Sequence, residues 1–285
     1  MLVSRCALRI AIVFLLIQKL WATCPSYTIS TIAGSSAGSS GDGGAATSAK
    51  LTKPYGVWGD DAGYLYIADA GNHRVRKIAL STGIITPFAG TGTDGYSGDG
   101  GPALNAAFET PMHIMGDGAG KIYISDYDGD VVRVVDTSST VTSTANDVKV
   151  NSGGYIASAA GNGVDGYNGD NRRPTDAWVN MPAFLYMDVV NNKLYFTEYG
   201  QQGKSPGCRL RRVDRATGLI FTMAGDGTCS HSGDGGLAIN ARINEPWGLW
   251  LDSSSNIYIG TGASCRVRRI DASTGVITTF AGTSR

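Results

Sequence analysis

The sequence predicts an all-β fold made of four repeated units, each containing four short strands. Three observations predict it: a Gly-Asp motif recurs four times, a proline follows each motif at a constant distance, and glycine is abundant. Glycine supplies 40 of the 285 residues, about twice the usual proportion of roughly 7%, which suits short strands joined by tight turns. No sustained helical periodicity follows residue 25, so long amphipathic helices are not expected.

The Gly-Asp motif opens each repeat. It reads Ser-Gly-Asp-Gly-Gly in three repeats and is degraded to Asn-Gly-Asp-Asn in the third. Its aspartates, and the prolines that stand twelve residues after them, are Asp42 and Pro54, Asp99 and Pro111, Asp170 and Pro182, and Asp234 and Pro246. Four identical offsets indicate one structural unit used four times.

Each repeat continues with four strand-length segments rich in β-branched and aromatic residues, and it closes on an Ala-Gly pair. Four strands per repeat is the composition of a propeller blade. The first segment of each repeat shows little polar alternation, as expected for radial sheets that are covered on both faces. We therefore predict an all-β propeller with blades at approximately 51–90, 108–161, 179–225 and 243–282.

Residues 27–34 read as an extra strand of the closing type, ahead of the first blade. Four sets of the first three strands therefore accompany five closing strands, and the sequence leaves open a closed ring of four blades or an open arc. The repeats differ in length, because successive motif aspartates are 57, 71 and 64 residues apart. The excess falls in the polar segment 137–154 and in the hairpin 199–207, which either carry binding or are neutral insertions.

The first 22 residues are typical of a secretory signal peptide, with Arg5 and Arg9 ahead of an apolar run and Ala22 as the cleavage residue. The apolar run is too short to span a bilayer, which needs about 20 residues. We expect a secreted, extracellular mature protein, residues 23–285, without membrane insertion after cleavage.

Cysteine usage agrees with export. Without Cys6, which lies in the signal, four cysteines remain: Cys24, Cys208, Cys229 and Cys265. An even number suits disulfides in an oxidising compartment, and no Cys-x-x-Cys spacing suggests zinc. In up-and-down blades the loop that carries Cys229 emerges on the same face as the hairpins that carry Cys208 and Cys265. We expect the Cys208–Cys229 pair.

The motifs resemble the NHL repeat in its secreted, teneurin-like form, over nearly all of residues 29–282. The strings that carry the likeness are Gly-Tyr-Ser-Gly-Asp-Gly-Gly-Pro-Ala at 95–103, Pro-Tyr-Gly-Val at 54–57, Leu-Tyr-Ile-Ala-Asp at 65–69 and Asn-His-Arg-Val-Arg-Lys at 72–77. The resemblance implies a β-propeller, and NHL propellers commonly have six blades, which this chain does not supply. Related propeller enzymes hold a metal in the central channel, but the matching inner-strand residues here are mostly apolar.

Carboxylates recur in two places. The motif aspartates each supply one carboxylate, whereas Ca²⁺ takes 6–8 oxygens, so we interpret them as turn residues rather than metal ligands, and no metal or cofactor is expected. A second set ends one strand and faces arginines on the next strand of the same hairpin. It predicts structural ion pairs in three blades: Asp69 with Arg76, Asp126 with Arg133, and Glu198 with Arg211.

The charges and the histidines exclude some functions. Lys plus Arg equal Asp plus Glu at 24 each, so no net field attracts nucleic acid. His73, His113 and His231 occupy unrelated repeat positions, which argues against a shared metal site.

Three functions stay open. The first is an extracellular scaffold that recognises a protein or glycan through its loop face. Its candidate residues are Tyr96, Tyr167 and Tyr199, which either serve as anchors or pack onto the sheet, and the motif residues Asp42, Asp99, Asp170 and Asp234. The second is a hydrolase or lyase with a metal in the channel. The third is a partial propeller that oligomerises or assembles with another chain.

Overall fold

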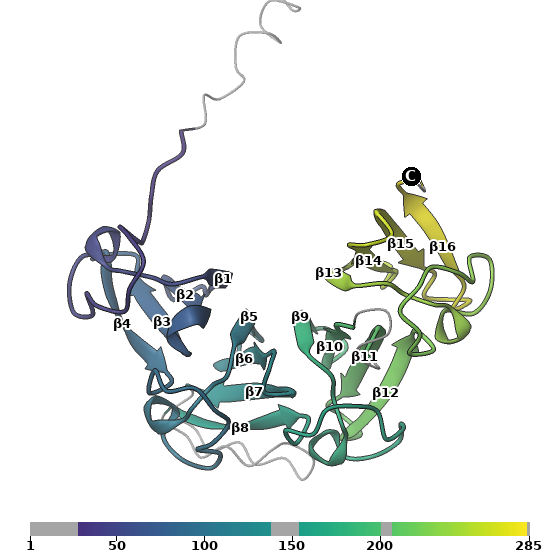
Figure 1. The fold of residues 1–285 in the computed structure, drawn as a ribbon, viewed down its shortest axis with the longest axis horizontal. Helices are drawn as coiled ribbons and strands as arrows, with labels where there is room; N and C mark the ends of the chain where they lie inside the picture. Colours follow the sequence, from purple (N-terminus) through teal and green to yellow (C-terminus); the bar gives the residue numbers. More distant parts are fainter. Residues whose placement is uncertain (1–27, 138–153, 201–206, 284–285) are drawn as a thin grey trace, which may run out of the picture. The chain divides into compact units, whose positions relative to one another are not determined.

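The residues that the structure describes form sixteen strands in four separate antiparallel sheets. The computed structural model describes residues 28–137, 154–200 and 207–283, and the chain divides into compact units at 1–32 and 33–285. In each sheet the strands pair in sequence order (Figure 1). The sheets are called blades 1 to 4, and the first strand of each is its inner strand. The predicted signal 1–22 and Cys24 lie outside the described residues.

The strand boundaries repeat closely from blade to blade. Blades 1 and 2 consist of β1 (Pro54–Gly59), β2 (Tyr64–Asp69), β3 (Arg74–Ala79) and β4 (Ile84–Ala89), then β5 (Pro111–Gly116), β6 (Lys121–Asp126), β7 (Val131–Asp136) and β8 (Tyr155–Ala160). Blades 3 and 4 consist of β9 (Pro182–Asp188), β10 (Lys193–Glu198), β11 (Arg209–Asp214) and β12 (Leu219–Ala224), then β13 (Pro246–Leu251), β14 (Ile257–Thr261), β15 (Arg266–Ile270) and β16 (Ile277–Ala281). Every inner strand begins at a repeat proline, which tolerates a strand's first position because it lacks an N–H.

Short 3-10 turns lie in the segments that lead into the blades and in the β2–β3 connection of blade 1. They are η1 (Ala46–Ser48), η2 (Ala70–Asn72), η3 (Ala103–Asn105), η4 (Pro174–Asp176) and η5 (Ala238–Asn240). Four of them follow the Gly-Asp motifs, and η3, η4 and η5 contact the outer strands β4, β8 and β12 of the preceding blade. Each linking segment therefore lies between two blades.

Three apolar layers of the core lie between neighbouring blades, and a further buried cluster packs the segment before blade 1 against that blade. The inner strands contact one another in the order β1, β5, β9, β13. Phe108, for example, is buried in a cluster that joins Val75 of blade 1 to Ile124 of blade 2. The arrangement explains why the blades need apolar residues on both faces, as the sequence predicted.

The extra strand expected at 27–34 is not found in the described part of that segment. Residues 28–34 form no strand, because the place beside β15 that a returning N-terminal strand would fill is taken by β16, and an extended segment needs a partner for its N–H and C=O groups. Within the described residues, no helix is long and apolar enough to cross a membrane.

Candidate functional site

An aromatic cluster lies where the β6–β7 and β10–β11 hairpins meet the inner strands. Tyr127 directly follows β6, Tyr199 follows β10, Trp247 is the second residue of β13 and Phe184 the third of β9. The Trp247 ring centroid lies 4.5 Å from that of Tyr199 and 6.3 Å from that of Tyr127, with which it is nearly parallel. We call these four residues the central aromatic cluster; it draws on three blades.

The cluster combines a buried base with a partly exposed rim. Tyr199 is buried, whereas Tyr127, Phe184 and Trp247 are half-buried. Burial raises the pKa of the Tyr127 phenol, and the nearby Asp128 and Glu245 carboxylates raise it further. The Tyr127 hydroxyl is therefore neutral across the physiological range and available to donate a hydrogen bond.

Carboxylates crowd around this cluster. Burial raises the pKa of Asp130 to about 6. The hydrogen bond from the Met181 N–H lowers this pKa, whereas the like charges of Asp165, Glu109 and Asp128 raise it. Burial also raises the pKa of Glu109, to which Asp94 and Asp128 contribute. Of these acids, Asp128 acts on Tyr127 of the cluster, as does Glu245, and both favour a cationic group over the ring faces.

The strand-end acids hold the segments that lead into the inner strands. Asp69 accepts the N–H of Thr52, and Asp126 accepts the N–H groups of Thr110 and Glu109. In blade 4 Thr261 stands at this position, and its hydroxyl donates to the carbonyl of Arg266 instead. The recurring carboxylate is explained by loop attachment rather than by a ligand.

Asp126 is expected to make the fold less stable as pH rises. Burial raises the pKa of its carboxyl to about 7, although the N–H bonds from Thr110 and Glu109 lower it. The folded state therefore holds this proton more tightly than the unfolded chain, whose aspartates have a pKa near 3.9, and stability falls between about pH 4 and pH 7. Asp126→Asn should melt above the wild type at pH 8, by an excess that disappears near pH 4. Thermal melts across this range, with the exposed Asp61→Asn as control, test this; equal melting temperatures at pH 8 would contradict it.

The Gly-Asp motif aspartates accept hydrogen bonds from buried arginines of their own repeats. Four arginines, Arg76, Arg133, Arg211 and Arg268, are fully buried. They donate to Asp42, Asp99, Asp170 and Asp234 respectively, over 2.5–3.3 Å. Three of these arginines also donate to carbonyls of the segment that leads into their blade. Each motif is therefore anchored to the third strand of its own blade.

A bulge in the outer strands of blades 2, 3 and 4 supplies a further donor to the motif. Opposite the buried arginines, the N–H groups of Ser158, Thr222 and Thr279 leave the ladder and donate to Asp99, Asp170 and Asp234. In blade 1 the equivalent residue is Pro87, which has no N–H. There Asp42 accepts from Arg74 as well as from Arg76. These contacts leave the four motif aspartates as structural groups.

The expected strand-end ion pairs form unevenly. Arg211 Nη1 lies 2.9 Å from Glu198 Oε1, but Arg76 Nη1 lies 3.8 Å from Asp69 Oδ2. The expected pair of Asp126 with Arg133 is wrong as a direct contact: among the described residues, Arg133 has its ion pair with Asp99. Hairpin register brings the strand-end acid near the arginine, but in blades 1 and 2 the guanidinium lies closer to the motif carboxylate.

The three tyrosines proposed as anchors pack against the fold. The Tyr96 hydroxyl lies 2.7 Å from Ser158 Oγ, and its ring faces Arg133. Tyr167 lies over the Arg209 guanidinium at 4.1 Å. Tyr199 is buried, so its expected role as an exposed anchor is wrong, although it is part of the central aromatic cluster.

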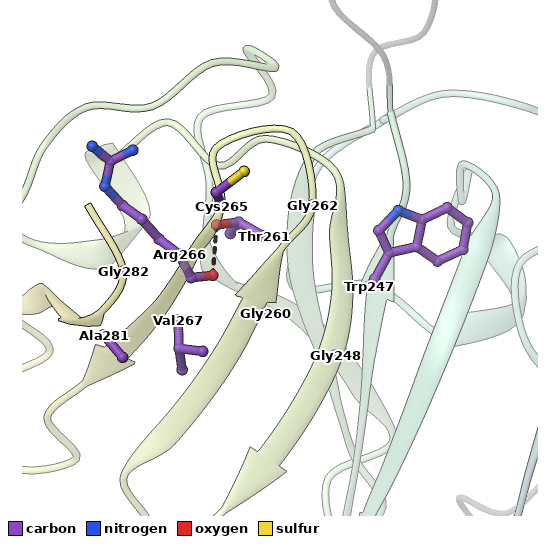
Figure 2. Close-up of a pocket in the computed structure, with 10 residues that line it drawn as sticks. All are labelled: Trp247, Gly248, Gly260, Thr261, Gly262, Cys265, Arg266, Val267, Ala281 and Gly282. Carbon is purple, nitrogen blue, oxygen red and sulfur yellow. Dashed lines mark hydrogen bonds between the residues drawn. The ribbon is translucent and has the colours of Figure 1, made fainter. Parts of the chain in front are cut away.

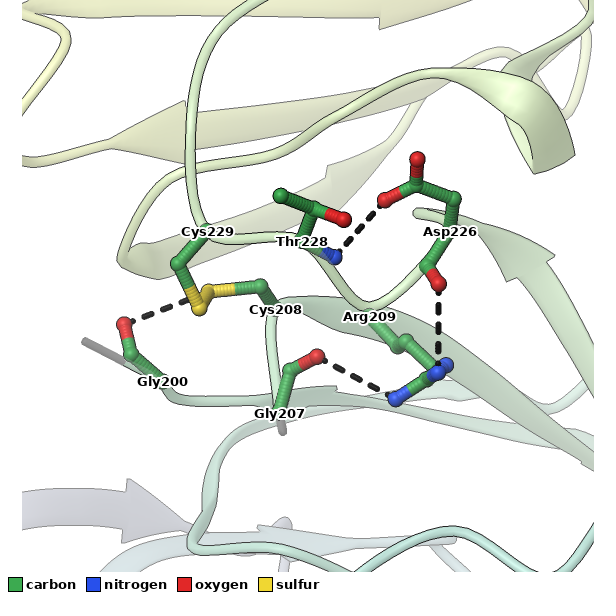
Figure 3. The surroundings of a disulfide bond; sticks show 7 residues. All are labelled: Gly200, Gly207, Cys208, Arg209, Asp226, Thr228 and Cys229. Carbon is green, nitrogen blue, oxygen red and sulfur yellow. Dashed lines mark hydrogen bonds between the residues drawn. A yellow bond between two sulfur atoms is a disulfide. The ribbon is translucent and has the colours of Figure 1, made fainter. Parts of the chain in front are cut away.

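Cys208 and Cys229 form a disulfide (Figure 3), and this is the pairing favoured from the sequence. It joins the start of β11 to the segment that leads into blade 4. Cys265 occupies the matching place at the start of β15 and carries a free, exposed thiol. Part of the long hairpin 199–207 and nearly all of the enlarged loop 137–154 lie outside the described residues.

A shallow groove of about 390 Å³ lies on the last blade beside Cys265 (Figure 2). Its lining is mostly apolar and comes from β13 to β16 and from the turn between β14 and β15. The lining residues are Trp247, Gly248, Gly260, Thr261, Gly262, Cys265, Arg266, Val267, Ala281 and Gly282.

The histidines lie apart. His113 lies between blades 2 and 3, where burial lowers its pKa to about 4 and the Leu185 N–H points at Nδ1. The His73 ring contacts the Glu109 carbonyl, and burial and nearby arginines lower the pKa of His231. In the part of the chain that the structure describes, no three His, Cys, Asp or Glu side chains are placed to hold a metal ion.

Sequence reasoning missed Tyr127, Phe184 and Trp247. Their repeat positions differ: Tyr127 follows a strand-end acid, while Phe184 and Trp247 stand at neighbouring positions of inner strands. The available signal was the departure from the repeat pattern, since these positions hold Ala70, Gly56 and Tyr55 in blade 1.

Comparisons with known proteins show the fold. No protein-family model matches the chain. Protein SUPPRESSOR OF QUENCHING 1, chloroplastic, of Arabidopsis thaliana is 23% identical over 216 residues, which are 74% of this chain and 18% of that protein. An auxiliary nutrient binding protein from Bacteroides ovatus superposes with a TM-score of 0.55 at 15% identity, covering 82% of this chain and 50% of that one. A streptogramin B lyase superposes with a TM-score of 0.51 at 13% identity, covering 82% and 56%. The chain has a β-propeller fold.

The propeller assignment is therefore established, whereas the NHL type stays a prediction. The chain spans 18% of the Arabidopsis protein and about half the length of the two propellers of known structure. The central aromatic cluster lies at the inner strands of this propeller, where chain segments from three blades converge.

Proposed function

We propose that this propeller is a secreted binding protein that recognises a protein or glycan through the face bearing the central aromatic cluster. The observation that carries the proposal is the cluster itself: half-buried rings from three blades gather at one place, with carboxylates around them. Preassembled aromatic side chains lose little conformational freedom on binding, and residues of this kind dominate interface energetics.

The charge around the cluster favours a partner with basic side chains. A lysine or arginine placed over Trp247 or Tyr127 would gain a cation–π contact, with Asp128 and Glu245 as counter-charges. A glycan would use the same rings and carboxylates through stacking and hydroxyl hydrogen bonds. The Bacteroides ovatus neighbour named as a nutrient binding protein supports a binding role for this fold.

The proposal is tested on arrays of basic peptides and of glycans. Trp247→Ala and Tyr127→Ala should each weaken capture by more than roughly tenfold, because truncating a central aromatic anchor costs more than about 1.4 kcal/mol. Trp178→Ala, at an exposed aromatic outside the cluster, is the control and should bind like the wild type. Capture of basic peptides should also weaken as salt rises.

Two results would contradict the proposal. Capture that is unchanged in both cluster variants would move binding elsewhere, and an absence of capture above background on either array would remove the support for a binding role. Metal analysis of the purified protein adds a separate check, since a stoichiometric transition metal would favour the hydrolase or lyase alternative.

A further inference from the structure

The leading face of a blade is the face toward the next blade in the chain. In blade 4 this face exposes a residue whose counterparts are buried in the other three blades. The second residue of the third strand is Val75, Val132 or Leu210 in blades 1 to 3, and each is 0% exposed. Its counterpart in blade 4, Val267, is 36% exposed. Since the side chain and the strand position match, the difference comes from what covers the blade.

The aromatic residues of this face are also more exposed than their counterparts in blade 1, where Trp58 and Phe88 are half-buried. In blade 4, Tyr258 lies between Trp250 and Phe280, with ring centroids 5.5 and 5.1 Å away. In blade 1 the corresponding trio surrounds Tyr66, which is only 4% exposed because blade 2 covers it. Trp250 and Phe280 are 56% and 63% exposed. An aromatic surface of this kind is typical of a protein interface.

The interface between two neighbouring blades is here called a joint. Each joint within the chain contains one apolar side chain from the segment that links the two blades. Three residues before the repeat proline stand Phe108, Val179 and Ile243, all 0% exposed. Phe108 shares a cluster with Val75 and Ala89 of the preceding blade. We call these side chains the knobs; each closes the apolar layer between two blades.

The fourth knob, Leu51, stands three residues before Pro54 and has no blade ahead of it in the chain order. It is half-buried, unlike the other three. Beside it on β1, Val57 is 58% exposed, although its counterpart Ile114 in blade 2 is 1% exposed. The face of blade 1 that points away from blade 2, its trailing face, thus exposes the residues that form one side of a joint, a half-joint, in the other blades.

The groove of Figure 2 is the other half. Val267 and Ala281 line it, at the repeat positions of the residues that surround Phe108 in the first joint. Its third side is Gly260, which widens the groove relative to Ala68 at the same position of blade 1. The chain therefore carries a knob at one end of its blade array and a matching groove at the other.

We propose that a second copy of this chain docks head to tail, with its Leu51 knob in the groove formed by Gly260, Val267 and Ala281. The joint repeats, between two chains, the contact that the chain makes three times within itself. Such an interface is heterologous, and it closes into a ring when the rotation between copies allows. Two copies joined at both ends would contain eight sheets, twice the four of one chain, within the range of roughly 4–8 blades that propellers use.

A second copy is favoured over other occupants by two observations. Both half-joints are exposed among the described residues of one and the same chain. The propellers that share this fold are longer, since 82% of this chain covers only 50% and 56% of them. A second copy of the chain would supply further blades together with the matching surface.

Docking also requires a local rearrangement, because residues 33–34 of one copy and residues 281–282 of the other would take the same place. The Gly34 N–H donates to the Ala46 carbonyl over 3.0 Å, as the Gly90 N–H donates to the Ala103 carbonyl over 2.9 Å. Residues 33–34 therefore already lie where the end of a preceding outer strand would lie. In the joint, either this pair or residues 281–282 of the other copy is displaced.

Light scattering of the purified chain tests the proposal. We expect twice the chain mass for the wild type. Val267→Glu removes the groove and Leu51→Glu removes the knob, so each alone should halve the mass. Mixing the two variants should restore a dimer, because the groove of the Leu51→Glu copy and the knob of the Val267→Glu copy remain intact.

Val190→Glu is the control, since Val190 is 93% exposed and lies away from both faces in the turn after β9; it should stay dimeric. Circular dichroism and melting show whether each variant folds. A wild-type chain that is monomeric at all concentrations would overturn the proposal, and so would variants that fold and remain dimeric.

A cross-link keeps the proposal testable if the glutamate variants do not fold. Cys265 matches Cys208, and Ala37 stands five residues before Asp42, as Cys229 stands five before Asp234. Ala37→Cys should form a disulfide with Cys265 of another copy, seen as a covalent dimer that Cys265→Ser abolishes and peptide mapping identifies. The same disulfide formed within one chain would overturn the proposal by showing that blade 1 covers blade 4 of its own chain. Absence of the disulfide in oxidised protein would also count against it.

Discussion

Replacing Arg211 by methionine is expected to destabilise the folded protein by about 3–5 kcal/mol, the usual cost of removing one partner from a buried charge pair. Arg211 and Glu198 are both fully buried, and their charged atoms lie 2.9 Å apart. Arg211 also donates to Asp170 of the Gly-Asp motif. The substitution thus leaves one buried carboxylate unpaired and loosens the motif from its blade.

Urea unfolding followed by tryptophan fluorescence measures this loss. Arg173→Met is the matched control, because the Arg173 side chain is 77% exposed and an exposed ion pair contributes about 0–1 kcal/mol. Burial raises the pKa of Glu198 and Arg211 opposes that shift. Without Arg211 the carboxyl should bind a proton, so the loss should be smaller at pH 5 than at pH 8.

The double variant Arg211→Met with Glu198→Leu should recover part of the lost stability, since it removes the unpaired charge along with its partner. If Arg211→Met were as mild as Arg173→Met, or if the double variant were less stable than Arg211→Met alone, the buried pair would not be what anchors the third motif.

The second large effect is expected from the disulfide. Replacing Cys208 and Cys229 together by alanine should lower the free energy of unfolding by about 3 kcal/mol, the chain-entropy cost of opening a loop of roughly 15–25 residues; the two cysteines are 21 residues apart. The cross-link ties the start of β11 to the segment that leads into blade 4, so blade 4 should be the first to lose protection from hydrogen exchange.

Denaturant unfolding of the double variant, beside the wild type with and without reductant, measures this contribution. Cys265→Ser is the control and should unfold like the wild type, because its thiol is exposed and unpaired. Equal stability of the oxidised wild type and the double variant would contradict the prediction.

Much of the fold could be predicted because the determinants of a blade are local. Turn glycines, β-branched runs and the constant distance from Asp42 to Pro54 recur in each repeat, and they place the strands within a few residues of their observed bounds. The disulfide could be predicted for a similar reason, since blade topology places the loop of Cys229 beside the hairpin of Cys208.

The site was much less predictable. Hairpin register alone suggested that Arg133 pairs with Asp126, but the motif carboxylate of Asp99, 34 residues earlier, reaches it more closely. The sequence left open whether Tyr199 is an exposed anchor or packs onto the sheet, and the structure shows that Trp247 and Tyr127 from neighbouring blades contact its ring. The sequence pattern within one repeat does not show which side chains of different repeats contact one another.

The sequence by itself determined that this protein is built from four blades, where each begins, and that both faces of a blade are apolar, because short-range turn and strand preferences repeat in register. Only the tertiary structure decided that the motif aspartates are saturated by buried arginines, that rings from three blades converge, and that Val57 and Val267 are exposed at the two ends of the array. These features depend on contacts between residues far apart in the chain, and such contacts follow from how the sheets stack rather than from any local pattern.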